Sequence, residues 1–260
     1  IGLAPAEFVW QESFVSDVSP SSEINFKGTM DEAARLAFRI SWPEVLGGVV
    51  GMTGSYLKNS GQPARVEAAL DLTKAELALP WFGWQKAAGR PASGQVTLTV
   101  DQQAVRRVNS FKVTGSGLTL NGNVEFAAHS QWNKVNLGQL AIPGTHLSGQ
   151  VTNKAAEGFI LDFSGADADI QSLYDKPDAP DSPAAAASPA AKPQTPLDIR
   201  FAIGSVTTAP DRRLQGARGR IVRNTRGWSH LDINGTVGNG TPIVVQLVPN
   251  GSGRSMEIHT

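Results

Sequence analysis

Four histidines and three neighbouring aspartates are the residues of this chain whose types suit metal binding. The histidines are scattered, and no His-x-x-x-His pair places two of them on one helix face. Asp162, Asp167 and Asp169 lie close together, but their segment lacks the spacing and the closing glutamate of an EF-hand calcium loop. We therefore predict no metal site, and we interpret these aspartates as part of a polar turn that caps a helix.

The chain also lacks the motifs of a nucleophile or a phosphate-binding loop. Serine is plentiful, but no Gly-x-Ser-x-Gly elbow occurs, and no Ser, His and Asp set can be assembled. The glycines at 47–48, 115–117 and 235–240 are not followed by a Lys-Ser or Lys-Thr pair. We interpret them as turns and bulges, and we predict a protein that is not an enzyme and has no cofactor.

Composition argues against several further classes of function. The 23 Lys and Arg residues balance 23 Asp and Glu residues without a basic stripe, so nucleic-acid binding is not expected. The sequence contains no Cys, which removes disulfides and thiolate sites. No run of about eighteen apolar residues occurs, so no membrane-spanning helix is expected. Because the chain begins at Ile1 without a leader, we expect an excised or processed piece.

The stretch 66–100 contains two strand patterns. Apolar residues alternate with polar or small ones, in the period of a half-buried β-strand, at Val66, Ala68, Leu70 and Leu72. The apolar series resumes one step out of phase at Ala75, so we expect a bulge or tight turn near Thr73 and Lys74. A second alternating strand contains Val96, Leu98 and Val100.

A bend rich in aromatic and cationic residues joins these two strands. It contains two indoles around a glycine, then a lysine and a turn through Gly89 and Pro91. Indoles and cations are typical of the rim of an apolar surface, where they meet lipid tails and headgroups. They also suit an aromatic cluster that closes a turn, with solvated cations. Both interpretations stay open for Trp81, Trp84, Lys86 and Arg90.

Elsewhere the spacing predicts two short helices among many strands. Apolar residues at helical spacing indicate a helix over 31–38, capped by Thr29 or Asp31, and one helical turn is expected over 169–174. Another strand is predicted by the alternation of Phe159, Leu161 and Phe163.

Glycines shape the expected strands and turns. Those between 47 and 54 run through an apolar strand that reaches Leu57, where they favour a bend or the close approach of another backbone. A hairpin is predicted over 110–124, with one turn at 115–117 and a second turn at Asn121 and Gly122.

Residues 176–196 break the strand pattern. They are rich in Ala and Pro and contain no aromatic or β-branched apolar residue. Such a segment buries too little surface to offset its ordering entropy, so we predict a disordered insertion. It separates a β segment over 1–175 from a continuation of the same β structure over 197–260.

Many short strands with little helix predict an all-β fold of mostly antiparallel sheet. A sheet with one apolar face must cover that face, and the sequence offers too little helix to do so. Either two sheets close on each other as a sandwich, or one strongly curved sheet forms a trough filled by something apolar. Apolar and polar residues alternate in the same way in a sandwich and in a trough, so the sequence pattern does not distinguish the two.

Four segments carry a resemblance to a known family. The first, LDLTKAELALPWFGWQKAAGRPA, has a strand, an A-x-L-x-L-P run, a G-W-x-K element and a Gly/Pro turn. It resembles a segment of the AsmA-like family of bacterial envelope proteins, which includes YhdP and TamB. GFILDFSGADADIQSLY is similar to that family's strand, G-x-x-x-D-x motif and short helix. PLDIRFAIGSVTT and the segment that begins WSHLDINGTVGNG also agree, so the resemblance covers most of 23–260.

The resemblance implies a periplasmic, non-catalytic protein whose elongated, twisted, open β-groove carries phospholipid between the inner and outer membranes and supports the outer-membrane barrier. It also implies that an inner-membrane anchor and further repeats lie outside these residues. On this interpretation Glu67, Asp71, Thr97 and Asp162 face solvent. The predicted lining residues are Val66, Ala68, Leu70, Leu72, Val96, Leu98, Val100, Phe159, Leu161 and Phe163. The alternative is a closed β-sandwich that binds protein or glycan and holds the same residues in its core.

Overall fold

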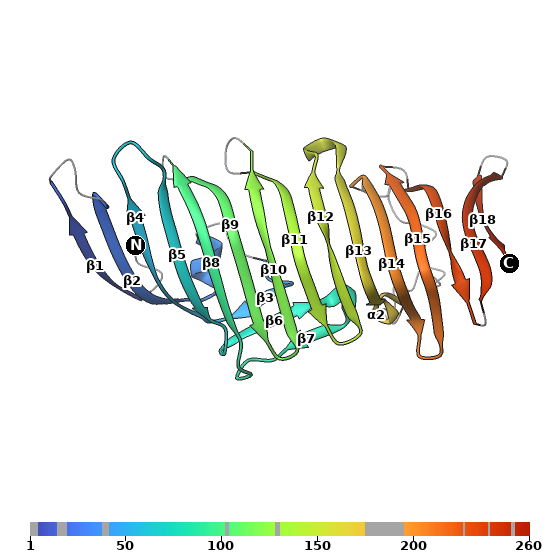
Figure 1. Ribbon diagram of the computed structural model, residues 1–260, viewed down its shortest axis with the longest axis horizontal. Helices are drawn as coiled ribbons and strands as arrows, with labels where there is room; N and C mark the ends of the chain where they lie inside the picture. The colour runs from blue at the N-terminus through green and yellow to red at the C-terminus, as the bar shows by residue number, and fades with distance from the viewer. Residues whose placement is uncertain are drawn as a thin grey trace, which may run out of the picture. The chain divides into compact units, whose positions relative to one another are not determined.

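The structure is a computed structural model that describes residues 5–14, 20–37, 42–101, 104–127, 131–174, 195–225, 227–238, 240–250 and 253–260. Strand makes up 73% of it. Fifteen strands form one mostly antiparallel sheet that is not closed into a barrel, and three strands form a small second sheet (Figure 1). The predicted all-β fold and open sheet are confirmed, and the described residues do not form the closed sandwich.

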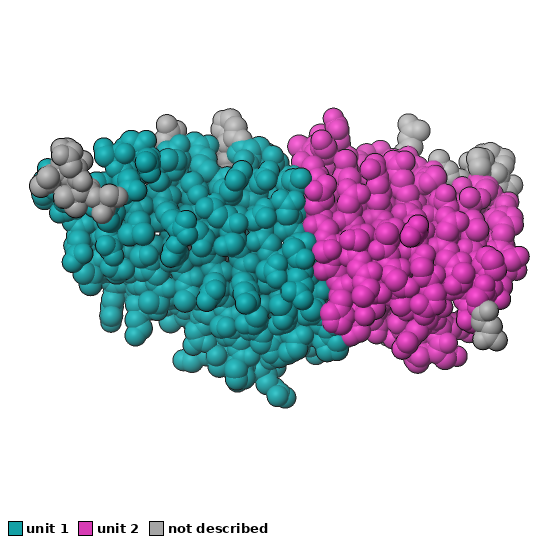
Figure 2. Space-filling view, viewed as in Figure 1, with its two compact units in different colours: residues 1–80, 84–143 teal, residues 81–83, 144–260 magenta. Residues whose placement is uncertain are grey.

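The contacts of the chain divide it into two compact units (Figure 2). Unit 1 consists of 1–80 and 84–143, and unit 2 consists of 81–83 and 144–260. In each unit the strands of the large sheet lie in chain order.

Unit 1 holds eight strands of the large sheet and the whole of the small one. The large-sheet strands are β1 (Ala6–Glu12), β2 (Ser22–Met30), β4 (Val50–Lys58), β5 (Ala64–Asp71), β8 (Ser93–Asp101), β9 (Ala104–Gly115), β10 (Leu118–Phe126) and β11 (Trp132–Ile142). The small sheet has the order β3-β6-β7, with β3 (Leu46–Gly48), β6 (Ala75–Leu79) and β7 (Trp84–Lys86). A helix, α1 (Glu32–Ala37), also belongs to unit 1, and the 3-10 turn η1 (Pro80–Phe82) joins β6 to β7, although its residues 81–82 are assigned to unit 2.

The inserted elements of unit 1 all lie at one end of its strands. The helix α1 and strand β3 connect β2 to β4, and β6 and β7 connect β5 to β8, so both insertions leave the large sheet at the same end. We call this the covered end, and we call the other end, where β1 turns into β2 and β4 into β5, the open end. Figure 1 shows the small sheet crossing the lower ends of the strands.

Unit 2 contains the remaining seven strands. They are β12 (Thr145–Asn153), β13 (Phe159–Asp169), β14 (Leu197–Ala209), β15 (Arg212–Asn224), β16 (Gly227–Val237), β17 (Thr241–Asn250) and β18 (Gly253–His259). The 3-10 turn η3 (Ala155–Glu157) precedes β13, and the helix α2 (Gln171–Tyr174) follows it. The end of the strands that carries α2 is the covered end of unit 2, and β13 begins at its open end.

One strand pair departs from the antiparallel pattern. Strands β13 and β14 run parallel, with Leu161 opposite Ile199 and Phe163 opposite Phe201. A parallel pair requires a long crossover, because the chain must return to the end from which it started. The predicted disordered insertion belongs to this connection, and its residues 176–194 lie outside the described residues.

Some local expectations for helices and turns are confirmed, but Asp162 and Asp167 lie inside strand β13 and not in the predicted polar turn, and only Asp169 caps a helix, by accepting the backbone N–H of Gln171 (3.0 Å). Ala34 donates its backbone N–H to Oδ1 of Asp31 (2.8 Å), so Asp31 caps α1. A turn at Thr73 and Lys74 absorbs the slip in apolar phase, and the chain then enters the small sheet. No helix in the described parts of the chain is long and apolar enough to cross a lipid bilayer.

The predicted turn at Asn121 and Gly122 is wrong. Both residues lie inside β10, which pairs with β9 and β11 on either side of them. The hairpin turn at 116–117 is confirmed. An Asn-Gly pair favours a turn, but here pairing on both sides of the strand overrides that local preference.

Candidate functional site

The large sheet of unit 1 has one continuous apolar face. Val66 lies opposite Leu98 on β8 and Tyr56 on β4, and Ala68 lies opposite Val96 and Gly54. Because side chains alternate along a strand, these cross-strand rows share one face, and Glu67 and Thr97 form a row on the other face. The predicted residues of β5 and β8 are therefore neighbours. Further apolar rows follow on β9 to β11, with Phe111, Val113, Leu120, Val124 and Val135.

Away from the covered end, the described side chains of this face are only partly buried. Val66, Ala68, Val96, Leu98 and Val100 are only half-buried. On β1 the side chains of Phe8 and Trp10 are 59% and 67% exposed. A packed core would bury such side chains almost completely. Their exposure is typical of a surface that binds an apolar ligand or partner.

Phenylalanine rings lie over glycines at paired positions of the apolar face. Phe26 lies opposite Gly54, and a Cβ added to that glycine would sit 2.7 Å from Cζ of Phe26. The same Cβ would overlap the backbone oxygen of Glu67 on β5. Phe111 and Gly122 repeat the arrangement, with the corresponding ring carbon at 2.8 Å. At these glycines the neighbouring strand therefore bends toward the apolar face, and the ring fills the space that the missing side chain leaves.

The small sheet closes the covered end of unit 1. Leu72 is 3% exposed and forms a buried cluster with Val50, Ala75 and Ala92. Leu70 packs against this cluster from the large sheet, and Leu77 packs against it from the small sheet. Of the predicted lining residues, Leu70 and Leu72 thus touch a closed core, and the others of β5 and β8 lie on the open part of the face.

Two buried cations hold the covered end together. Lys86 is 2% exposed, and its Nζ donates hydrogen bonds to the carbonyl oxygens of Thr73 (3.3 Å), Ala75 (2.7 Å) and Ala87 (3.2 Å). Desolvation by burial lowers the pKa of Lys86 below its usual value of 10.5. Arg35 of α1 is also 2% exposed and donates to the carbonyl oxygen of Gly48 at 2.7 Å. Both side chains thus donate hydrogen bonds to backbone carbonyl oxygens, and both are buried from solvent.

Trp84 and Arg90, two further residues of the predicted aromatic and cationic bend, also lie at the covered end of unit 1. Trp84 is half-buried, and its Nε1 donates to the carbonyl oxygen of Ser116 (3.3 Å). Arg90 is exposed and lines a cleft of about 770 Å³ beside the small sheet, together with Glu76 and Gln85. The side chain of Trp81 lies outside what the structure describes. Trp84 and Lys86 thus belong to strand β7 of the small sheet itself, at the end where the apolar face is closed.

Unit 2 has an apolar face of its own. Phe159, Leu161 and Phe163 of β13 share this face with Leu197, Ile199 and Phe201 of β14, because the parallel register places them side by side. Ile221, Leu231, Ile233, Val245 and Leu247 continue the apolar rows on β15 to β17. Phe163 lies over Gly149 and Phe201 lies over Gly219, as the rings of unit 1 do. All three predicted lining residues of β13 are half-buried and belong to one face.

A row of irregular residues shifts the apolar phase near the covered end of unit 2. The pairing of β13, β14 and β15 skips Ala166, Gly204 and Gly216. Gly216 has a φ of +59°, a left-handed conformation that glycine adopts readily. Beyond this row the apolar face continues with Ala168 and Val206, both almost fully buried.

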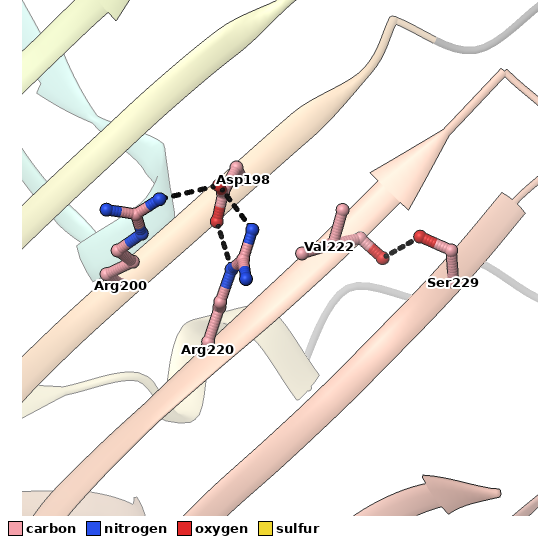
Figure 3. A network of polar contacts seen from close by, with 5 residues as sticks. All are labelled: Asp198, Arg200, Arg220, Val222 and Ser229. Atoms are coloured by element: carbon pink, nitrogen blue, oxygen red, sulfur yellow. Dashed lines mark hydrogen bonds and ion pairs between the residues drawn. The ribbon is translucent and has the colours of Figure 1, made fainter.

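The opposite face of unit 2 is polar. Asp198 accepts two hydrogen bonds from Arg220, at Nε and Nη2 (2.9 Å each), and one from Nη2 of Arg200 (3.2 Å), as Figure 3 shows. The hydrogen bond from Arg220, with that from Arg200, holds the pKa of Asp198 below its usual value of 3.8. Asp162 lies opposite Arg200 on this face, as its predicted solvent-facing position requires.

The polar face of unit 2 also carries a pair of His and Asp side chains. Nδ1 of His146 lies 2.8 Å from Oδ1 of Asp167, and both side chains are exposed. Ser205 lies two strands from His146, and its Oγ accepts a hydrogen bond from Nε2 of Gln215 (3.2 Å). Among the described residues no three His, Asp or Glu side chains gather as metal ligands.

Aromatic and cationic side chains also occur at the open ends, where sequence reasoning did not place them. In unit 1, Nε1 of Trp10 donates to Oγ of Ser22 (3.0 Å), and Lys58 pairs with Ser22 from the other side. In unit 2, Arg223 lies over the ring of Trp228, with 5.4 Å between Cζ and the ring centroid. Trp10 and Trp228 each lie within a few residues of the end of a strand. A tryptophan close to a predicted strand end is therefore the sequence signal that could have identified these two positions.

Comparison with models of protein families, with curated proteins and with solved structures gives no match for this chain.

Proposed function

We propose that this chain is a segment of a periplasmic, non-catalytic protein whose apolar sheet face carries phospholipid acyl chains between the inner and outer membranes. The observation that carries the proposal is the uncovered apolar face of unit 1, which bends toward its apolar side at Gly54 and Gly122 while the other face is polar. The resemblance to the AsmA-like family supports the same conclusion, as well as an inner-membrane anchor outside these residues and a role in the outer-membrane barrier.

Acyl chains suit this face for a physical reason. Each buried CH₂ group contributes roughly 0.8 kcal/mol, and a face of many similar apolar rows offers many similar contacts. Equivalent weak contacts favour a chain that slides over one that is held in a single pose. The flat phenylalanine rings over Gly54 and Gly122 support sliding, because they fill the floor without a protruding side chain.

The alternative of a protein- or glycan-binding sandwich has less support. A sandwich needs a second sheet of similar size over the apolar face. The only second sheet among the described residues has three strands, and its apolar contacts are with the covered end.

Native mass spectrometry of the whole chain, purified from a bacterial host, tests the proposal. We expect phospholipid to co-purify and to be identified after organic extraction. Leu98→Asp places a charge in the middle of the open face and should reduce bound lipid several-fold in a folded protein. Thr97→Asp is the matched control, because Thr97 precedes Leu98 on the same strand and belongs to the opposite face.

The outcomes separate the two functions. Because Leu98→Asp can also disturb folding, circular dichroism must show strand content unchanged, and Val66→Asp tests the same row from β5. A wild-type chain that unfolds cooperatively but carries no lipid, and takes none from vesicles, contradicts the proposal.

A further inference from the structure

The two ends of the strands in unit 2 differ in burial. Its described apolar residues that are almost fully buried all lie toward the covered end: Leu147, Ala168, Val206 and Ala217. At the open end, Phe159 and Leu197 are half-buried and Trp228 is 49% exposed. An acyl chain that lies on this face is therefore shielded from water most completely near the covered end.

The two ends also differ in charge. At the covered end the cross-strand row of Asp169, Thr207 and Arg213 carries charges of both signs, and it lies on the face opposite Ala168 and Val206, with which it alternates. At the open end the cross-strand row Phe159, Leu197 and Arg223 brings a guanidinium into line with the apolar residues. A negatively charged group of a ligand on the apolar face is thus attracted to the open end, where Arg223 lies in line with the apolar residues.

Arg223 is held in position from two sides. Its Nε and Nη2 donate to the carbonyl oxygen of Thr195 (3.3 and 3.2 Å), and its guanidinium lies over Trp228. These bonds do not use Nη1, and they orient a planar group whose geometry suits a phosphate. An indole beside a cation at the edge of an apolar surface is the arrangement that proteins use at the lipid headgroup level.

We propose that Arg223 and Trp228 bind the headgroup phosphate of a phospholipid whose acyl chains lie on the apolar face of unit 2 and extend toward the covered end. This rests on the proposed function and adds to it a headgroup site and a polarity of the lipid along the strands.

A competition between two lipids that differ only in phosphate tests the headgroup site. The whole chain is incubated with vesicles that contain phosphatidic acid and diacylglycerol with identical acyl chains, and bound lipid is measured by mass spectrometry. A cation near the surface should favour phosphatidic acid about five-fold. Arg223→Gln should bring the ratio close to one, and Arg223→Lys should restore much of it. Arg218→Gln is the matched control, because Arg218 is exposed on the same strand and pairs with Asn234 on the polar face.

The competition separates failure of this inference from failure of the proposed function. A wild-type chain that takes up neither lipid contradicts the proposed function. Uptake of both lipids with no preference, or with a preference that survives Arg223→Gln, overturns the headgroup site alone. Loss of the preference in excess inorganic phosphate identifies a general anion site and also overturns it.

A second measurement needs no substitution. A phospholipid with a photoreactive diazirine in its headgroup is loaded and crosslinked, and the modified peptides are mapped. The headgroup should label peptides at 223–228, and a diazirine at the end of an acyl chain should label peptides that contain Ala168 or Val206. Headgroup labels at the covered end would overturn the proposed polarity.

Discussion

Glycine and phenylalanine act as paired residues on both apolar faces. The glycine permits a neighbouring strand to approach on the apolar side, and the ring opposite it restores the apolar contact that a missing side chain would lose. Gly54 with Phe26 and Gly219 with Phe201 show the same arrangement in different units. The bend of the face is thus encoded in single residues, and each pair can be tested separately.

Gly54→Ala should destabilise unit 1. The new Cβ would overlap the carbonyl oxygen of Glu67 and press on Cζ of Phe26, so a loss of about 1–3 kcal/mol in the free energy of unfolding is expected. The measurement is urea unfolding followed by circular dichroism. The control is Gly47→Ala, whose Cβ would have its closest contact at 3.4 Å from Glu76, and whose change should stay within about 0.5 kcal/mol. Equal effects of the two substitutions would contradict this account.

Single residues also show where sequence reasoning reaches its limit. The Asn-Gly pair at 121–122 favours a turn locally. In the structure, however, Gly122 lies within a strand, and its missing side chain leaves the space that the ring of Phe111 fills. Lys86 has the side chain of a solvated cation, yet it is 2% exposed because three carbonyl oxygens converge on it. Both outcomes depend on partners distant in the sequence, which a local pattern does not contain.

The Asp198 network ties β14 to β15 on the polar face. Asp198 is on β14 and Arg220 is on β15, so their hydrogen bonds cross the strand pair (Figure 3). Because these bonds favour the charged carboxylate, the pKa of Asp198 is lower in the folded chain than the usual 3.8. The network therefore stabilises the fold fully above about pH 4, and the stabilisation is lost as the pH falls through the lowered pKa.

Asp198→Asn should show this pH dependence. Near pH 6 the variant should unfold at a lower urea concentration than wild type, and this difference should shrink as the pH is lowered toward 2, because the wild-type carboxyl becomes protonated as the pH falls through its lowered pKa. Asp211→Asn is the control, because Asp211 is exposed in the turn between β14 and β15, at the other end of β14 from Asp198. A difference between Asp198→Asn and wild type that is the same at both pH values would argue against the network.

The alternation of apolar and polar residues predicts where strands lie, but it does not predict how the strands pair or how sheets pack on one another. The strands predicted over 66–72, 96–100 and 159–163 correspond to β5, β8 and β13, with Leu72 just beyond the end of β5, because a half-buried strand must alternate. The parallel pairing of β13 and β14 was not predicted, since register depends on the path of the connection. The small sheet at the covered end of unit 1 was not predicted either. Strands β6 and β7 would show the same alternation of apolar and polar residues whether they extended the large sheet or packed against it.

In the parts of the chain that the structure describes, the main apolar faces of the two units carry no second sheet of similar size. Folded domains usually bury such faces against a second layer, which supplies much of their stability. Here most predicted lining residues stay half-buried, and the edge strands β1 and β18 carry exposed apolar side chains such as Trp10 and Ile258. A ligand that covers these faces must then add to the free energy of unfolding, because the unfolded chain has no such face to offer.

Thermal unfolding with a single-tailed phospholipid measures that contribution. A ligand at about 100 times its dissociation constant adds roughly 2.7 kcal/mol, which corresponds to a rise of about 5–10 °C in Tm for a chain of this size. We expect this rise for wild type with lysophosphatidylcholine below its micelle concentration, and for Thr97→Asp. Leu98→Asp should show a much smaller rise, because its carboxylate must be desolvated when the acyl chain binds. A Tm that falls in wild type would mean that the lipid binds the unfolded chain more tightly than the folded one, contrary to a preformed apolar face.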